Sequence, residues 1–302
     1  RDSSTSRGLG DVYKRQDTTL PMDFYPTENL KYRIHEHIEC GGGPASNGAY
    51  LLAKWGMDTT MMTAVGNDYY GEQIIKEFRE VGASVECIEV HSNYMTPSSY
   101  IIANRSKGSR TIITSKKDPI RKLNHSGDIH ADLILVDGEH PETAEAVLRA
   151  NPLAISVIDA GRLTEDTKRL GKLVKYVVCS KTFAEEFADR KIDVTDRDSL
   201  VYCYEKLQEY FQNTVVITLE DKGSFTKLEN YEVLPTVPVQ AVDSTGAGDI
   251  FHGAFTYFIG NGYSLRTAIH YASITSAISV TRVGARISIP ELTEVLNYDE
   301  LI

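Results

Sequence analysis

The chain has 302 residues, with 32 lysines and arginines against 42 aspartates and glutamates, which gives a net charge of −10. Proteins that bind nucleic acid or an anionic membrane rely on a cationic surface, so this composition disfavours both partners. The four cysteines show no Cys-x-x-Cys spacing. There is no signal-peptide pattern and no apolar run of the roughly 18 to 20 residues that a membrane span needs, so we expect a cytoplasmic protein.

Residues 1–16 are polar, rich in serine, glycine and arginine, and show neither the period of a strand nor that of a helix. We therefore expect an anomalous tail or an artefactual N-terminus here, outside the packed core. The folded domain is expected to span residues 17–302 as one unit, because the rest of the chain contains no internal repeat and no low-complexity linker.

Two stretches are expected to form a small antiparallel β lid. Residues 18–40 carry tyrosine, isoleucine and histidine at strand-like spacing, and residues 98–113 contain a predicted hairpin around Lys107 and Gly108. Neither stretch has enough apolar residues to fold alone. The lid would therefore cover a site or pair with a second copy of the chain.

From about residue 40 onward, strand-like and helix-like segments alternate, which predicts a mostly parallel sheet covered by helices. The expected strands are Thr59–Val65, Leu133–Asp137, Ile155–Asp159, Tyr176–Cys179 and Thr214–Leu219. The expected helices are Pro44–Trp55, Gly71–Val81, Glu142–Ala150, Arg197–Phe211, Gly246–Gly260 and Ser264–Thr281. Three of these helices are followed by a glycine, which commonly ends a helix: Gly56, Gly82 and Gly262.

The strongest chemical pattern is Asp243–Phe251, where polar residues and glycines lead directly into an apolar helix. A helix that begins near Gly246 directs free N–H groups and its positive dipole end outward, and glycines let a phosphate approach that backbone. A carboxylate at Asp249 would repel phosphate unless it accepts the proton of an attacking hydroxyl. The pattern therefore favours phosphoryl transfer over a plain helix N-terminus. The chain has no Gly-x-x-x-x-Gly-Lys-Ser/Thr sequence, which disfavours a Walker P-loop kinase.

This segment resembles the C-terminal motif of the PfkB, or ribokinase-like, family of carbohydrate kinases. Gly42–Gly56 resembles the family's N-terminal Gly-Gly segment and helix, and Thr63–Gly71 resembles its next strand and turn. Residues 279–290 resemble its C-terminal end, so the similarity runs in order from about Asp17 to the C-terminus. The resemblance implies an α/β fold: a ribokinase-like three-layer α/β/α sandwich with a mostly parallel sheet and a small antiparallel β lid.

The resemblance also implies roles for individual residues. Asp249 would be the catalytic base that activates a sugar hydroxyl. The anion hole for the transferred phosphoryl group would consist of the amides of Gly246, Ala247 and Gly248. The sugar site would contain Asp17, Gly42, Gly43 and Asn47. In that site Asp17 would bind two sugar hydroxyls and the Asn47 amide would offer both a donor and an acceptor.

The nucleotide site implied by the resemblance contains Ser180, Thr218, Gly223 and Ser273. Two positions depart from the family: Glu220 replaces a glycine in the loop under ATP, and Ser180–Glu186 replaces an Asn-x-x-Glu motif. Glu185 and Glu186 are then the candidates for the carboxylate that organises magnesium. Mg²⁺ is expected with ATP, whose charge it neutralises. A monovalent cation such as K⁺ is suggested near Asp243, Thr245 and residues 283–288.

Four further residues have open or modest interpretations. Asp159 follows a predicted strand on the ligand side of the sheet, where it is either a structural cap or part of the site. Arg162 either reaches a phosphate or does not enter the site. His252 is interpreted as a packed residue rather than a ligand. Arg110, in the lid hairpin, either contacts substrate or keeps an edge strand soluble.

We therefore expect ATP-dependent phosphorylation of a hydroxymethyl group on a small sugar or sugar-like substrate, with the lid excluding water. Two alternatives stay open. One is a nucleoside kinase of the same family, and the other is a catalytically inactive sugar-binding or regulatory module. The expected partners are the sugar and ATP, with no nucleic acid and no membrane, and the lid is a candidate homodimer surface.

Overall fold

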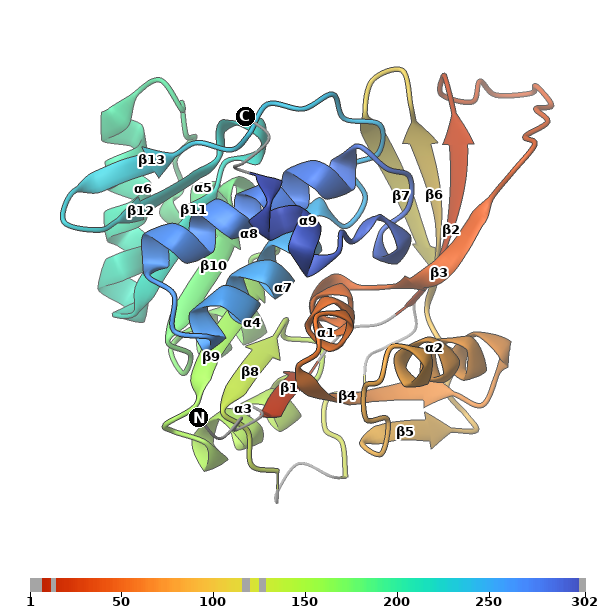
Figure 1. The fold of residues 1–302 in the computed structure, drawn as a ribbon, viewed down its shortest axis with the longest axis horizontal. Coiled ribbons are helices and arrows are strands. Elements are labelled where there is room, and N and C mark those ends of the chain that lie inside the picture. Colours follow the sequence, from red (N-terminus) through yellow and green to blue (C-terminus); the bar gives the residue numbers. More distant parts are fainter. Residues whose placement is uncertain (1–6, 12–14, 116–119, 125–128, 299–302) are drawn as a thin grey trace.

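The computed structural model describes residues 7–11, 15–115, 120–124 and 129–298. Within these ranges the chain forms a nine-stranded sheet with helices on both faces, and a separate four-stranded sheet lies beside it (Figure 1). This arrangement is the predicted α/β sandwich with a lid. None of the helices described is long and apolar enough to cross a membrane.

The large sheet has the strand order β13-β12-β11-β10-β9-β8-β1-β4-β5 in the described part of the chain. Neighbouring strands from β11 to β5 are parallel, and β12 and β13 pair antiparallel at one edge. Its strands are β1 (Arg7–Asp11), β4 (Asp58–Gly66), β5 (Ile88–His91), β8 (Leu133–Val136), β9 (Ile155–Ala160), β10 (Tyr176–Ser180), β11 (Thr214–Thr218), β12 (Ser224–Lys227) and β13 (Tyr231–Leu234).

Side chains alternate between the two faces of this sheet, and both faces are covered, which explains why β8, β10 and β11 are mostly apolar. In β10, Val178 packs into one hydrophobic core, while Val177 and Cys179 pack into the other. The first core is covered by α1 (Pro44–Lys54), α2 (Tyr69–Glu80), α7 (Ala247–Gly260), α8 (Leu265–Val280) and α9 (Leu292–Leu296). The second is covered by α3 (Pro141–Ala150), α4 (Glu165–Gly171), α5 (Lys181–Ala188) and α6 (Arg197–Phe211).

One prediction about the N-terminal residues is wrong. Arg7–Asp11, inside the expected tail of residues 1–16, forms β1 in the middle of the large sheet, between β4 and β8. Without β1, the facing backbone N–H and C=O groups of β4 and β8 would be buried with no hydrogen-bond partner. Pairing with β1 satisfies these groups. The strand forms although the sequence of Arg7–Asp11 has no apolar alternation. Residues 1–6 and 12–14 lie outside the described ranges.

The lid is a sheet of β2 (Arg15–Met22), β3 (Ile38–Gly42), β6 (Ser98–Asn104) and β7 (Ser109–Ser115). It uses both predicted stretches, and β6 and β7 form the expected hairpin, with Gly108 at φ 60° in its turn. One pair differs from the expected antiparallel arrangement, because β2 runs parallel to β6. In Figure 1 these strands stand together to one side of α1 and α2.

Candidate active site

The segment before α7 is held by the buried carboxylate of Asp243. Its Oδ1 accepts hydrogen bonds from the Thr245 backbone N–H (2.9 Å) and hydroxyl (2.6 Å), and its Oδ2 accepts one from the Gly284 N–H (2.9 Å). Gly246 then adopts a left-handed conformation (φ 74°) as the residue before the helix. The two loops predicted to surround a monovalent cation are thereby adjacent, and both Asp243 oxygens already have partners.

The first turn of α7 presents backbone N–H groups to open space. The Ala247 N–H makes a 3.3 Å turn contact with the Ser244 carbonyl, whereas within the described residues the N–H groups of Gly248 and Asp249 have no protein acceptor. A Cβ added at Gly248 would meet no atom within 4 Å. Free amides at the positive end of a helix dipole form an anion site. Among the three residues of the predicted anion hole, Gly248 is the most exposed. The Asp249 N–H is a further free donor in the same turn.

Asp249 lies in the same turn and is held by Asn47 of α1. The Asn47 Nδ2 donates a 2.7 Å hydrogen bond to Asp249 Oδ2. This contact depends on the close crossing of α1 and α7, where a Cβ at Gly253 would lie 2.7 Å from the Gly48 Cα. The structure thus brings together the predicted base and one predicted sugar ligand from opposite ends of the sequence.

Asp17 of β2 lies over the glycine segment at the end of β3. A Cβ at Gly42 would lie 2.0 Å from Asp17 Oδ2, so only glycine leaves room for this carboxylate. Burial raises the pKa of Asp17 to about 6, although Arg15 lowers it through a 2.6 Å ion pair with Oδ1. Its Oδ2 is buried and has no hydrogen-bond partner among the described residues. A buried acceptor without a partner can accept a hydrogen bond from a hydroxyl group of a ligand.

A buried arginine beside Asn47 was not predicted from the sequence. Arg286 is 2% exposed and forms an ion pair with Glu77 of α2 (2.5 Å). Its Nε donates to Asn47 Oδ1 (3.2 Å), and a Cβ at Gly41 would lie 2.0 Å from its Nη1. The sequence contains one indication of this buried side chain. Gly41, an additional glycine before the expected Gly42-Gly43 pair, is the residue that leaves room for the guanidinium.

His252 lies one turn further along α7 and contacts Asp159 at the end of β9. Its Nδ1 is 2.6 Å from the Gly248 carbonyl and its Nε2 is 3.0 Å from the Val178 carbonyl. Both nitrogens therefore face acceptors, and Asp159 Oδ2 lies 3.2 Å from Nδ1 without a hydrogen bond directed at it. Burial raises the pKa of Asp159, and the nearby charge of Asp249 adds to that rise. His252 is thus packed, as predicted, and Asp159 is buried beside it at the end of β9.

Two of the four predicted nucleotide residues, Ser180 and Thr218, lie at the carboxyl ends of the neighbouring strands β10 and β11. Ser180 and Thr218 are partners in the β10–β11 register. The Ser180 hydroxyl caps α5 by accepting from the Phe183 N–H (3.0 Å) and donates to the Gly161 carbonyl (3.2 Å). Glu220, at φ 56°, has the left-handed backbone that favours the glycine of the family, and Gly223 follows at φ 95°. Ser273 is buried in α8, 4% exposed.

The carboxylate predicted to organise magnesium is not found at the position where the resemblance places it. Phe183, fully buried, occupies the third position after Ser180, where the resemblance predicts a carboxylate. Glu185 is used elsewhere, because its oxygens contact Lys191 Nζ (2.7 Å) and the Ile192 N–H (3.0 Å). No group of three or more histidine, cysteine, aspartate or glutamate side chains in the described ranges could hold a metal ion.

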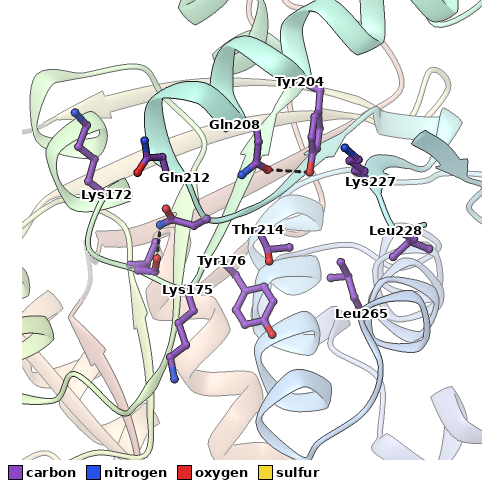
Figure 2. A pocket seen from close by; sticks show the side chains of 12 residues that line it. Lys172, Lys175, Tyr176, Tyr204, Gln208, Gln212, Thr214, Lys227, Leu228 and Leu265 are labelled. Carbon is purple, nitrogen blue, oxygen red and sulfur yellow. Dashed lines mark hydrogen bonds between the residues drawn. The ribbon is translucent and has the colours of Figure 1, made fainter. Parts of the chain in front are cut away.

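A groove of about 920 Å³ opens at the amino ends of β10 and β11, on the opposite edge of the sheet from these residues (Figure 2). Three lysines line it, but the Lys172 ammonium lies 3.8 Å from the Tyr210 ring centroid and the Lys175 ammonium donates to the Leu153 carbonyl (2.8 Å). Since the carboxyl ends of parallel strands carry the ligand crevice in open α/β folds, we place the site at Asp249 and not in this groove.

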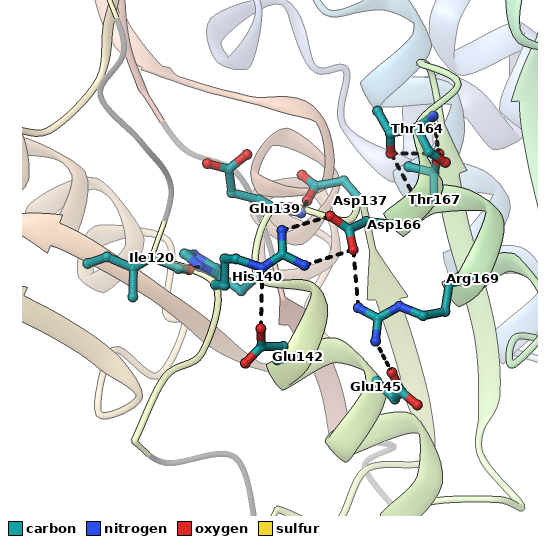
Figure 3. Close-up of polar contacts among 11 residues, drawn as sticks. Ile120, Asp137, Glu139, His140, Glu142, Glu145, Thr164, Asp166, Thr167 and Arg169 are labelled. Atoms are coloured by element: carbon teal, nitrogen blue, oxygen red, sulfur yellow. Dashed lines mark hydrogen bonds and ion pairs between the residues drawn. The ribbon is translucent and has the colours of Figure 1, made fainter.

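The chain between the lid and β8 is attached to the domain by Arg121. Its guanidinium makes two 2.9 Å hydrogen bonds to Asp166 and one of 3.2 Å to Glu142, and Asp166 also contacts Arg169 (Figure 3). These side chains are largely exposed, so each ion pair contributes about 1 kcal/mol or less. Next to them, the buried His140 contacts the Ile120 carbonyl through Nδ1. The network positions the chain that leaves the lid and adds no group to the site.

Comparison with known proteins assigns this geometry to a family. Residues 17–292 match the pfkB family of carbohydrate kinases. The ribokinase of Haemophilus influenzae is 26% identical over 302 residues, with 97% of each chain covered. A bifunctional ribokinase/ribose-5-phosphate isomerase A of Fructilactobacillus sanfranciscensis is 27% identical over 298 residues, which cover 93% of this chain and 54% of that protein. A nucleoside kinase of Methanothermobacter thermautotrophicus is 23% identical over 295 residues, covering 92% and 90%.

Solved structures share the fold. The crystal structure of ribokinase from Thermotoga maritima superposes with a TM-score of 0.80 at 24% identity, covering 98% of this chain and 99% of that one. The structure of Arabidopsis thaliana ribokinase complexed with ribose and ATP superposes with a TM-score of 0.80 at 20% identity, covering 97% of both chains.

The fold and the family match together define a phosphotransferase with an alcohol group as acceptor. Helices on both faces of the sheet and a lid beside the strand ends are the ribokinase-like arrangement. The chain belongs to the pfkB family of carbohydrate kinases, and it is an ATP-dependent kinase of a sugar or nucleoside.

Proposed function

We propose that the protein transfers the γ-phosphoryl group of ATP to a hydroxymethyl group of a small sugar or sugar-like substrate, with Asp249 as the base. The observation that carries this proposal is the Asp249 carboxylate beside free helix N–H groups, held by Asn47 at 2.7 Å. A base and an anion site in one helical turn suit an attacking hydroxyl and a transferred phosphoryl group.

In this mechanism the substrate hydroxyl lies between Asp249 and the γ-phosphorus. Asp249 Oδ2 already accepts from Asn47, so Oδ1 takes the hydroxyl proton. The substrate oxygen forms the new bond to phosphorus as the bond from phosphorus to the β–γ bridging oxygen breaks, and ADP leaves with that electron pair. The amides of Gly246, Ala247 and Gly248 stabilise the charge on the transferred group, and Gly248 is the most exposed of the three residues.

The sugar site is proposed at Asp17, Gly42, Gly43 and Asn47. The support is the buried, unpartnered Oδ2 of Asp17 above Gly42, which can accept hydrogen bonds from sugar hydroxyls. The relatives named ribokinase, and the ribokinase solved with ribose and ATP, favour a pentose as the first substrate to try. We place the nucleotide beside Ser180, Thr218, Gly223 and Ser273.

Magnesium is proposed to arrive with ATP, held by the phosphates and water, because the described residues supply no carboxylate cluster for it. The monovalent cation is proposed between the loop of Asp243 and Thr245 and the loop of Gly284, which the Asp243 carboxylate holds together. Carbonyl oxygens, the usual ligands of such a cation, would come from these two loops.

A nucleoside substrate is the second candidate, because a nucleoside kinase is among the relatives at similar coverage. An inactive sugar-binding module, the third alternative, is disfavoured by the family match, although Phe183 and Glu220 occupy positions where the family has functional residues. A panel of pentoses, hexoses, ketoses, aldonates and nucleosides, tested for substrate-dependent ADP release from ATP, separates all three. A sugar that binds without ADP release would support the inactive module.

The base assignment is tested by Asp249→Asn. We expect kcat to fall about a thousandfold, because the amide cannot accept the proton, while the affinity for the sugar changes little. Asp198→Asn, an exposed aspartate at the start of α6, is the matched control and should retain full activity. Near-normal turnover of Asp249→Asn would show that another group accepts the proton.

A further inference from the structure

Arg286 is buried in the protein interior next to the proposed base, and its guanidinium has a partner in each direction. Nη1 forms the 2.5 Å ion pair with Glu77, Nη2 donates to the Ser46 hydroxyl (2.6 Å), and Nε donates to Asn47 Oδ1 (3.2 Å). The same group lies over the Phe78 ring, 4.7 Å from its centroid. These contacts require a planar cation with several donors. A lysine ammonium could not make all of them.

The contacts with Arg286 and Asp249 together determine which way the Asn47 amide points. Arginine has only donors, so the oxygen of the amide must face it. The Nδ2 group then faces Asp249 Oδ2, where it donates the 2.7 Å hydrogen bond. A rotated amide would place its oxygen against the carboxylate and its NH2 group against the guanidinium, so Arg286 adds to the preference for the observed orientation. Arg286 therefore acts on Asp249 through Asn47.

The surroundings show that the chain is built around this arginine. Glu77 neutralises it and also accepts hydrogen bonds from the Gly41 N–H, at 2.9 Å to both carboxylate oxygens. A Cβ at Gly41 would lie 2.0 Å from Nη1, so a larger residue there would displace the guanidinium. A buried charge is tolerated only with such partners. The contacts connect β3, α2, α1 and the segment 286–288 to the first turn of α7.

We propose that Arg286 is a positioning residue for catalysis: through Asn47 it fixes the orientation of Asp249 and does not itself contact the reacting atoms. Glu77 is the residue that holds Arg286 in place. This inference rests on the proposed role of Asp249. Because Asn47 touches the base, the loss of Arg286 should lower kcat more than it raises the KM for the sugar.

The test uses the double variant Glu77→Gln/Arg286→Met, which removes both charges together and leaves no unpaired buried charge that would prevent folding. We expect kcat to fall about tenfold or more, with KM changed less. The control is Arg282→Met/Glu294→Gln, which removes an exposed ion pair from the same C-terminal segment and should keep wild-type kcat. Arg286→Lys with Glu77 intact should recover only part of the loss, because one ammonium cannot reproduce the three contacts.

A double-mutant cycle with Asn47→Ala distinguishes a positioning role of Arg286 from a purely structural one. If Arg286 acts through Asn47, Glu77→Gln/Arg286→Met should lower kcat little further in the Asn47→Ala background, while it lowers the melting temperature equally in both backgrounds. Equal losses of kcat with and without Asn47 would overturn the proposal. So would a kcat within about twofold of wild type in the folded double variant.

A second measurement needs no substrate and so separates this inference from the proposed reaction. The side-chain amide of Asn47 can be followed by ¹⁵N NMR, with its signal assigned by its loss in Asn47→Ala. In the wild type we expect slow exchange of the proton donated to Asp249, and in Glu77→Gln/Arg286→Met faster exchange and a changed shift. An unchanged signal would overturn the positioning role, whereas a changed signal in a protein that phosphorylates no sugar would reject the proposed function alone.

Discussion

At the scale of single residues, Asp17 gives a prediction that depends on pH. Burial raises its pKa from 3.8 to about 6, so between these values the folded protein binds more protons than the unfolded chain, and stability falls as the pH rises through this window. Above pH 6 the ionised carboxylate costs about 3 kcal/mol. Asp17→Asn should therefore raise the free energy of unfolding at pH 7.5, and this gain should disappear near pH 4.

This prediction is checked by denaturant unfolding at both pH values, with Asp23→Asn, an exposed residue just after β2, as the control for removing one charge. The same substitution should weaken sugar binding strongly, because the amide cannot accept from two hydroxyls as a carboxylate does. If Asp17→Asn is less stable than the wild type at pH 7.5, the ion pair with Arg15 stabilises the ionised carboxylate by more than burial destabilises it.

Which residues were predictable from the sequence depends on how local their contacts are. Asp249 and its glycines form one helical turn, so a nine-residue pattern was enough to find them. Arg286 contacts Asn47 and Glu77, both more than 200 positions away, and no local pattern marks such a residue. Asp159 and His252 were noticed, but their contact joins β9 to α7 and was visible only in the structure.

At the scale of elements, the crossing of α1 and α7 predicts opposite effects for two nearby alanine substitutions. In Gly253→Ala the new methyl group would lie 2.7 Å from the Gly48 backbone, so the helices must separate. We expect a loss of about 1 to 3 kcal/mol of stability and a lower kcat, because the Asn47–Asp249 contact lengthens.

The second substitution, Gly248→Ala, places its methyl group where no atom lies within 4 Å. Stability should rise by up to about 1 kcal/mol, since alanine favours a helix over glycine. Activity should nevertheless fall, because the methyl group enters the space proposed for the phosphoryl group. Thermal unfolding and steady-state kinetics of the two variants check both effects. Loss of stability in Gly248→Ala would show that this space is not open.

The elements that the sequence predicted are those with a strong apolar period, and each predicted strand of the large sheet lies within about two residues of its expected bounds. The shorter α4 and α5 were missed, since seven or eight residues span only two helical turns and carry little periodicity. β1 was missed for a different reason. Its sequence Arg-Gly-Leu-Gly-Asp has no strand-like apolar period, although its backbone pairs with both β4 and β8.

At the scale of the whole molecule, the outer face of the lid predicts pairing with a second copy. Asp17 points toward the site, and by the alternation of side chains the neighbouring residues of β2 and β6 point away from it. On that outward face Tyr100 and Ile113 are cross-strand partners, 49% and 60% exposed. β7 is also an edge strand, paired with β6 alone among the described strands. Exposed apolar pairs and an open edge favour association.

We therefore expect the wild type to be a dimer at micromolar concentration, and Tyr100→Glu/Ile113→Lys to be a monomer with the same melting profile at low concentration. Light scattering after size exclusion measures both masses. Leu153→Lys, which changes a 90% exposed leucine before β9, tests whether any exposed apolar residue has this effect, and it should leave the dimer intact. If the lid variant and the wild type have the same mass, this face does not join two copies.

The monomeric variant also tests whether pairing keeps the lid closed over the site. An open lid would let water reach the γ-phosphate more freely, so ATP hydrolysis in the absence of sugar should then increase in the monomer.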